Sequence, residues 1–169
     1  MVIKYPNKFL REPTVMVDLP LNTDHESLIK TMIEKMYKNN GVGLAANQIG
    51  SSNKIFVIDI SNEKNNPQVF INPIIKKQSK EKLTEEEGCL SCPGQLSNVR
   101  RHIYVGLKWF CEHGKEHYKT FYNFPARVIQ HEMDHLNGIL FIDRVTSKDD
   151  LNKELRKEGF NEKDVISIN

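Results

Sequence analysis

The chain is organised around one stretch, which reads Gln130-His131-Glu132-Met133-Asp134-His135-Leu136 and is followed by Asn137-Gly138. Residues four apart lie on the same face of an α-helix, so His131 and His135 can direct their imidazoles at one point while Glu132 flanks that point. Burying these three groups is costly unless a cation and its bound water satisfy them. The stretch therefore predicts a divalent metal site with a base beside it.

The residues around this stretch predict a helix over roughly 125–137. Pro125 suits a first turn, Asn123 is a candidate N-terminal cap, and Asn137-Gly138 offers a left-handed stop. The apolar stripe of this helix consists of Ile129, Met133 and Leu136, and its polar side consists of Arg127, Gln130, Asp134 and Asn137.

The chain has 169 residues, about the size of one ordinary domain, and we expect a single domain over residues 1–169. Residues 146–169 form a highly charged C-terminal tail, in which Leu151 and Leu155 have the spacing of a short surface helix. The net charge of +2 implies no strong electrostatic partner, which argues against nucleic acid as the main ligand.

The three cysteines, Cys89, Cys92 and Cys111, argue against a disulfide framework and for a reducing compartment. The first residues do not have the composition of a secretory leader, and no apolar run approaches the roughly 20 residues of a membrane span. We therefore expect a cytoplasmic protein with no membrane partner.

The pattern of apolar residues predicts an α+β fold, with antiparallel sheets packed around the central metal-binding helix and an additional N-terminal helix. The first twenty residues, with three prolines, read as an extended arm, and roughly 24–39 reads as an amphipathic helix. Pro73 predicts a bulge or an edge in its strand, and residues 76–87 read as a solvated surface strand or turn. The predicted strands are 55–60, 69–75, 102–110 and 117–124.

These residues alone do not identify the third metal ligand. A catalytic ion usually keeps three protein ligands and an open position, and Cys89 could be the third because a thiolate suits Zn²⁺ or Fe²⁺. Cys89 and Cys92 together with the two histidines also match a closed structural Cys2His2 zinc module, although the intervening residues 93–130 exceed the usual finger spacing. An HExxH-type metallopeptidase is a further alternative. Glu132 argues against the closed structural site, which has no use for a base, whereas a metallopeptidase would need the same base.

Three stretches, taken together, resemble the signature motifs of the peptide deformylases in the order found in that family: Gly41-Val42-Gly43-Leu44-Ala45-Ala46-Asn47-Gln48, Glu87-Gly88-Cys89-Leu90-Ser91 and Gln130-His131-Glu132-Met133-Asp134-His135-Leu136. The resemblance extends from the N-terminal arm to about Asp143. It implies removal of the formyl group from the N-terminal formylmethionine of newly synthesised bacterial polypeptides. It also implies one divalent metal ion per chain, with Fe²⁺ as the native ion, Zn²⁺, Ni²⁺ or Co²⁺ as substitutes, and the ribosome as a candidate partner.

The resemblance implies a role for each matching residue. Cys89, His131 and His135 match the metal ligands, with water as the fourth. Glu132 matches the general base and acid, which assists attack of the metal-bound water on the formyl carbon.

The resemblance also implies how the substrate is held. The Gln48 side chain and the Leu90 backbone N–H would donate hydrogen bonds to the oxyanion. An extended substrate backbone would add to the edge formed by this segment. The residues expected at the substrate backbone and in the methionine pocket are Val42, Gly43, Gly88, Phe124 and Val128.

Three further positions, Glu87, Asp134 and Leu96, lie in or near the motifs. Glu87 and Asp134 could orient a ligand histidine or could be ordinary surface carboxylates. Several bacterial relatives carry a basic residue a few positions after the cysteine motif, whereas this chain has Leu96 there.

Overall fold

The computed structural model describes residues 1–146, so the charged tail predicted at the C-terminus lies, from residue 147 on, outside the described residues. In chain order the elements are η1 (Lys8–Arg11), α1 (Thr23–Lys38), β1 (Gly43–Ala45), η2 (Ala46–Ile49), β2 (Ile55–Ile58), β3 (Gln68–Gln78), β4 (Lys82–Cys89), β5 (Cys92–His102), β6 (Tyr104–Phe110), β7 (Glu116–Tyr122), α2 (Asn123–Leu136) and η3 (Phe141–Arg144). Six consecutive strands, β2 to β7, separate the N-terminal elements from helix α2, and the elements labelled η are short 3-10 helices.

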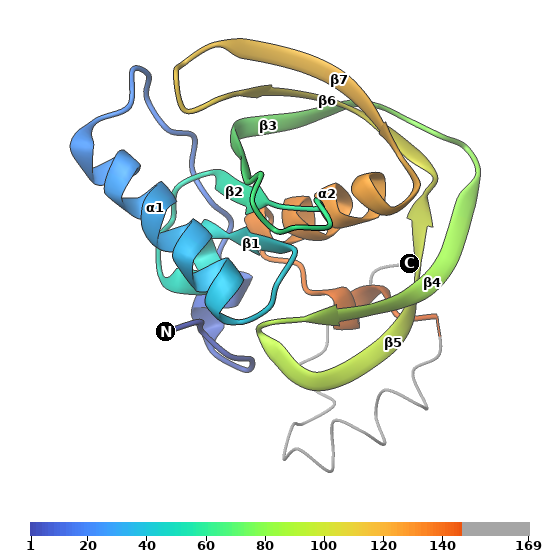
Figure 1. Ribbon diagram of the computed structural model, residues 1–169. Coiled ribbons are helices and arrows are strands. Elements are labelled where there is room, and N and C mark those ends of the chain that lie inside the picture. Colours follow the sequence, from blue (N-terminus) through green and yellow to red (C-terminus); the bar gives the residue numbers. More distant parts are fainter. Residues whose placement is uncertain (147–169) are drawn as a thin grey trace.

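The strands form two antiparallel sheets. One has five strands in the order β1-β2-β3-β6-β7, and the other is the β4–β5 hairpin. Helix α2 lies in the centre of the molecule between these sheets, and α1 covers the other side of β1 and β2 (Figure 1). This arrangement is the predicted α+β fold around a central helix. Within the described residues, no helix is long and apolar enough to cross a membrane.

Strand β2 explains how the two helices share one sheet. Its alternate residues face opposite sides, so Phe56 packs in the apolar cluster under α2 while Val57 packs in the cluster under α1. Both faces are covered, and all four residues of β2 are buried. This is why the sequence of β2 is a nearly continuous apolar run rather than an alternating one.

Both predicted helices form, with one correction at a cap. Helix α2 begins after Tyr122, and Asn123 is not the cap: it has a φ of 53° and lies within the first turn. The predicted stop is confirmed, because Gly138 adopts a φ of 73° and a Cβ there would lie 2.2 Å from the Arg11 carbonyl oxygen. Only glycine fits this close approach without strain.

The middle of the chain departs from the prediction in three ways. Residues 82–89 form strand β4, which is a mostly exposed strand as expected, but Glu87 within it is buried and not solvated. Strand β5 was not expected at all, since Pro93, Gly94 and the charged pair at 100–101 interrupt its pattern. Pro73 lies at a shift of register in β3, which is an interior strand, so the bulge rather than the edge is correct.

Candidate metal centre and active site

The predicted metal ligands lie together. The Sγ of Cys89 and the ring nitrogens of His131 and His135 all lie within 4.8 Å of one another, and Sγ is 3.1 Å from Nε2 of His135. Helix α2 supplies both histidines one turn apart, and the end of β4 supplies the cysteine. The set of one thiolate and two imidazoles suits a tetrahedral divalent ion that keeps one open position.

Each histidine is held so that its Nε2 side faces the centre. Nδ1 of His131 lies 3.1 Å from a carboxylate oxygen of Glu87, which leaves Nε2 for the ion. Nδ1 of His135 is buried without a partner, and the backbone carbonyl of this residue accepts a hydrogen bond from the Asn47 amide. Of the two predicted orienting carboxylates, Glu87 therefore contacts a histidine.

Asp134 contacts Arg101, which in turn contacts Glu87. Its oxygens accept from Arg101 and from Arg144, at 2.5 and 2.7 Å for the latter. Arg101 in turn donates two hydrogen bonds of 2.9 Å to Glu87. Burial alone would raise the pKa of Glu87, but His131 and Arg101 reverse this and hold it well below its usual range. The carboxylate is thus charged and rigidly held where it fixes the His131 ring.

The charges within the cluster show that it favours a bound cation. The pKa of Cys89 is lowered, chiefly by a hydrogen bond from Cys92 and, against the effect of burial, by the two histidines. Burial lowers the pKa of His131, but Cys89 and Glu87 outweigh burial and raise it. The surroundings therefore stabilise a thiolate and a positive charge beside it, which is the charge pattern that a divalent ion would satisfy.

Glu132 lies beside this cluster with one oxygen unused. It is buried, and its Oε2 has no hydrogen-bond partner. Burial raises the pKa of Glu132 to about 7, with the two histidines opposing this rise. Its other oxygen lies against the backbone of β1, because a Cβ at Gly43 would be 2.3 Å from Oε1. A carboxyl group with this pKa can both accept and donate a proton near neutral pH.

Gln48 is fixed with its amide N–H group toward the centre. Its Oε1 accepts from the Ala45 N–H at 2.8 Å, so Nε2 points to Ser91 Oγ at 3.1 Å and to Cys89 Sγ at 3.6 Å. Leu90 directly follows Cys89 at the tip of the β4–β5 hairpin. The two residues predicted to supply oxyanion donors therefore both lie next to the cysteine.

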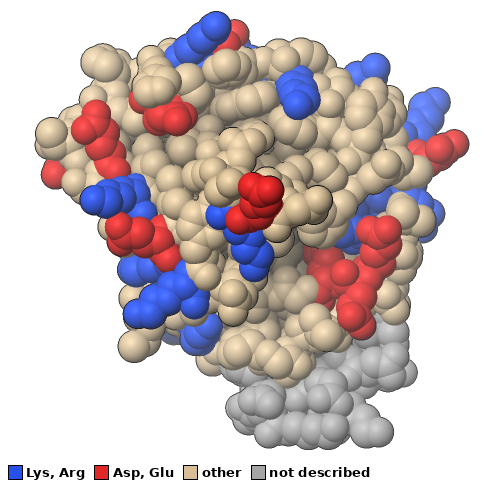
Figure 2. Space-filling model, viewed as in Figure 1, with Lys and Arg blue, Asp and Glu red and all other residues tan. Residues whose placement is uncertain are grey.

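A cavity of about 600 Å³ opens in front of these groups. All of the predicted site residues line it except His135, which is buried behind His131. Phe124 and Val42 are exposed at its edge, Val128 is buried, and Leu96 adds a further exposed apolar side chain. Acidic side chains gather over β4, basic and acidic side chains lie together over the end of α1, and a small group of charged side chains lies between them (Figure 2).

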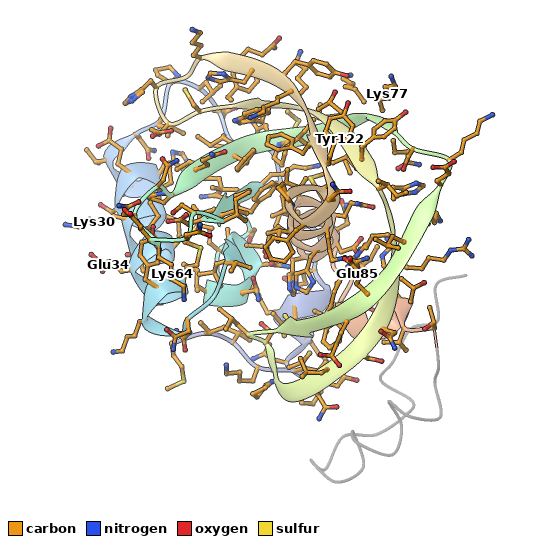
Figure 3. The ribbon with its side chains drawn as sticks, turned by 45° about the vertical axis from the view of Figure 1, so that its right-hand side comes forward. Lys30, Glu34, Lys64, Lys77, Glu85 and Tyr122 are labelled. Carbon is orange, nitrogen blue, oxygen red and sulfur yellow. The ribbon has the colours of Figure 1, made fainter. Side chains whose placement is uncertain are left out.

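The helical pattern places Arg127 on the polar side of α2, but this side chain is buried. Its guanidinium donates to Glu85 at 2.7 Å, to Glu87 at 2.6 Å and to the carbonyls of Leu83 and Val99. Glu85 lies between β4 and α2 (Figure 3). Arg127 thus joins the helix that carries the histidines to both strands of the hairpin. In the sequence, the one indication of this role is the dense set of acidic residues on β4.

Cys92 does not belong to the ligand cluster formed by the described residues. It is buried among Leu10, Val99 and Phe141, and its pKa is raised by the hydrogen bond to Cys89 and by burial. Cys92 is therefore a neutral thiol that donates to the Cys89 sulfur. This placement weighs against a closed Cys2His2 site.

Comparison with known proteins agrees with this geometry. Residues 1–151 match the family model described as polypeptide deformylase. A peptide deformylase of Prochlorococcus marinus (strain AS9601) is 54% identical over 144 residues, covering 84% of this chain and 72% of that protein. Another, from Prochlorococcus marinus subsp. pastoris, is 44% identical over 169 residues, covering 99% of this chain and 84% of its own.

Solved structures show the same similarity. The peptide deformylase of Synechococcus elongatus, in complex with actinonin, superposes with a TM-score of 0.93 at 36% identity, covering 99% of this chain and 90% of that one. A class I type b peptide deformylase of Acinetobacter baumannii with Met-Ala-Ser bound gives a TM-score of 0.80 at 33% identity, covering 86% and 97%. The chain therefore belongs to the polypeptide deformylase family.

Proposed function

We propose that residues 1–169 form one catalytic domain that removes the formyl group from the N-terminal formylmethionine of newly synthesised polypeptides. Family membership makes the chain a peptide deformylase, a hydrolase that acts on formylated N-termini. The family is metal-dependent, and the cluster of Cys89, His131 and His135 is compatible with a metal site. The observation that carries the mechanism is this cluster with the unpaired Glu132 carboxylate beside it.

We infer Fe²⁺ as the native ion, with Zn²⁺, Ni²⁺ and Co²⁺ as substitutes, held by Cys89, His131 and His135. One thiolate and two imidazoles accept any of these ions. When bound, the ion would lower the pKa of a coordinated water towards ~7 and so make hydroxide available near neutral pH. The buried Nδ1 of His135 and the Glu87 contact of His131 both support coordination through Nε2.

Glu132 transfers the proton of the attacking water. Because burial places its pKa at about 7, the carboxylate can take the proton of the attacking water and then pass it to the departing amine. The glycine at position 43 leaves room for the carboxylate against the β1 backbone.

The charge that develops on the formyl oxygen is stabilised by two donors from this chain. Gln48 contributes Nε2, which is held in place by its Oε1 contact with Ala45, and Leu90 contributes its backbone N–H. Loss of one such donor typically costs about 10² to 10³ in rate.

The substrate backbone lies along the edge formed by Val42, Gly43 and Gly88, all of which line the cavity. Its hydrogen bonds would resemble those of an added strand. Phe124 and Val128 lie within one or two turns of His131 on the same helix and form the apolar pocket for the methionine side chain, with Val42 opposite.

The substrate class also indicates the compartment and the partner of the enzyme. Formylated chains emerge from ribosomes, so we propose that the enzyme acts in the cytoplasm, with the ribosome as a partner. The charged tail at 146–169 is the segment proposed to contact the ribosome, and a solubilising role is its alternative.

Formate release tests this function. Protein purified without air and loaded with Fe²⁺ is expected to release formate from a formyl-Met peptide, to leave the matching acetyl-Met peptide intact and to cleave no internal peptide bond. Formate release is measured with a coupled dehydrogenase, and peptide products by mass spectrometry. Internal cleavage without formate would indicate the HExxH-type peptidase instead.

A further inference from the structure

The N-terminal arm runs between the two segments that carry the proposed oxyanion donors. The Ile3 N–H donates to the carbonyl oxygen of Gln48 at 2.7 Å, and the Tyr5 N–H donates to the carbonyl oxygen of Ser91 at 2.8 Å. Between these residues, the ammonium group of Lys4 donates to the carbonyl oxygen of Leu90. Figure 1 shows the arm beside the tip of the β4–β5 hairpin. Three consecutive residues therefore tie two distant motifs together.

Lys4 contacts the turn between β4 and β5, and the sequence of this turn does not favour the backbone conformation that a two-residue turn needs. Cys89 pairs with Cys92, so Leu90 and Ser91 form a two-residue connection between β4 and β5. The two-residue turns that match strand twist need a positive φ, whereas Leu90 and Ser91, both described residues, are not among those with positive φ. The conformation of this turn therefore depends on contacts from outside the hairpin. These contacts come from Lys4, from Tyr5 and from Gln48, whose Nε2 lies 3.1 Å from Ser91 Oγ.

The Lys4 contact acts on a peptide group that faces the metal ligand. The carbonyl of Leu90 and the N–H of Ser91 belong to the same peptide group, and this N–H donates to Cys89 Sγ at 3.4 Å. A cation on the carbonyl polarises the peptide group, which makes its N–H a stronger donor to the sulfur. Hydrogen bonds to a ligand atom in turn tune its interaction with the ion.

We propose that Lys4 is a positioning residue of the reaction. Its ammonium group holds the Leu90–Ser91 peptide group, so that the Leu90 N–H stays directed at the formyl oxygen and the Ser91 N–H stays directed at the Cys89 sulfur. The proposal rests on the proposed deformylase mechanism, and it assigns to the N-terminal arm a part in the chemistry besides packing.

The chain offers a matched control for this proposal. Lys8 lies on the same arm, is exposed like Lys4, and does not line the cavity. Lys4→Met is expected to lower kcat for a formyl-Met peptide by about three- to tenfold, in line with losing one charged hydrogen bond that shapes a donor site, and to leave KM within about twofold. Lys4→Arg restores most of the lost rate, and Lys8→Met has no effect.

A second readout does not depend on turnover. In the zinc-loaded protein, the amide proton of Ser91 is expected to shift upfield in Lys4→Met, because its hydrogen bond to the sulfur weakens. Lys8→Met and Lys4→Arg keep the wild-type shift. If Lys4→Met folds poorly, Lys4→Gln is used for the same two measurements.

Three results would overturn the proposal: an unchanged kcat with an unchanged Ser91 amide shift, a rise in KM alone, which would show a direct contact with substrate, or an equal effect of Lys8→Met. A wild type that releases no formate would count against the proposed function instead, and the amide shift would still decide the role of Lys4.

Discussion

Cys89 and Cys92 face each other across the β4–β5 turn, yet their surroundings give them opposite properties. Cys89 lies beside two imidazoles, where its thiolate is favoured, and Cys92 lies in an apolar cluster, where its neutral thiol is favoured. A thiolate binds metal and a buried neutral thiol packs like a small hydrophobic residue. One cysteine of the pair is therefore expected to be a ligand and the other is not.

Replacing each cysteine separately tests this assignment. Cys92→Ala is expected to keep about one equivalent of metal per chain and most of the activity, because its sulfur contributes packing and a hydrogen bond but no coordination. Cys89→Ala is expected to lose the ion, and elemental analysis after dialysis measures both. A metal-free Cys92→Ala that stays folded would favour the closed Cys2His2 site.

Buried ion pairs, which the sequence of α2 alone does not predict, hold this helix in place. Its polar side is buried, and Arg127 and Asp134 on that side join β4, β5 and the segment after the helix. Glu87 accepts from both Arg127 and Arg101 while it holds His131. The network thus sets where the helix presents its metal ligands.

A buried ion pair and a surface ion pair should respond differently to loss of one partner. Arg127→Met is expected to lower the free energy of unfolding by about 3–5 kcal/mol, because it leaves the buried Glu87 with one cation fewer and two carbonyls without a donor. Lys108→Met, which breaks the exposed pair with Glu116, is expected to cost at most about 1 kcal/mol. Urea unfolding of the metal-loaded proteins measures both, and similar losses for the two variants would refute the assigned role of Arg127.

The elements that could be predicted from sequence are those whose pattern is local. Helices α1 and α2 and strands β6 and β7 show the periodicity of apolar residues expected for each, and strands β2 and β3 show the apolar runs of buried strands. Strand β5 does not, because its buried positions include the polar Gln95 and Arg101 while Leu96 is exposed, and Pro93 and Gly94 lie near its start. The three motifs indicated the site residues, whereas Arg127, Arg101 and Lys4 could not be predicted, since their partners lie at least 14 residues away in the chain.

Across the whole molecule, buried carboxylates make stability depend on pH in the acid range. Asp59 directly after β2 accepts from the Ser61 hydroxyl at 2.6 Å, from the Tyr37 hydroxyl of α1 at 2.5 Å and from two backbone N–H groups in the following loop. Burial opposes its ionisation, but these hydrogen bonds prevail and lower the pKa of Asp59 to about 2. The pKa of Glu87 is lowered as well.

A depressed pKa in the folded state means that the ionised group contributes stability above its unfolded pKa and loses it as pH falls. The stability that Asp59 and Glu87 contribute, followed by thermal unfolding, should therefore be nearly constant from pH 7 to about pH 5 and then fall steadily towards pH 2. Asp59→Asn is expected to reduce this acid-dependent loss by about 2 kcal/mol, because its amide does not titrate. An unchanged pH profile in this variant would contradict the assignment.

The most direct test of the mechanism is the comparison of wild type with Glu132→Gln, both loaded with Fe²⁺ and both with metal content determined. Glutamine has nearly the same shape but cannot take up the proton, so the variant is predicted to hold about one ion per chain and to release formate at least about 10²-fold more slowly. Full activity in Glu132→Gln with metal bound would contradict the central role of Glu132.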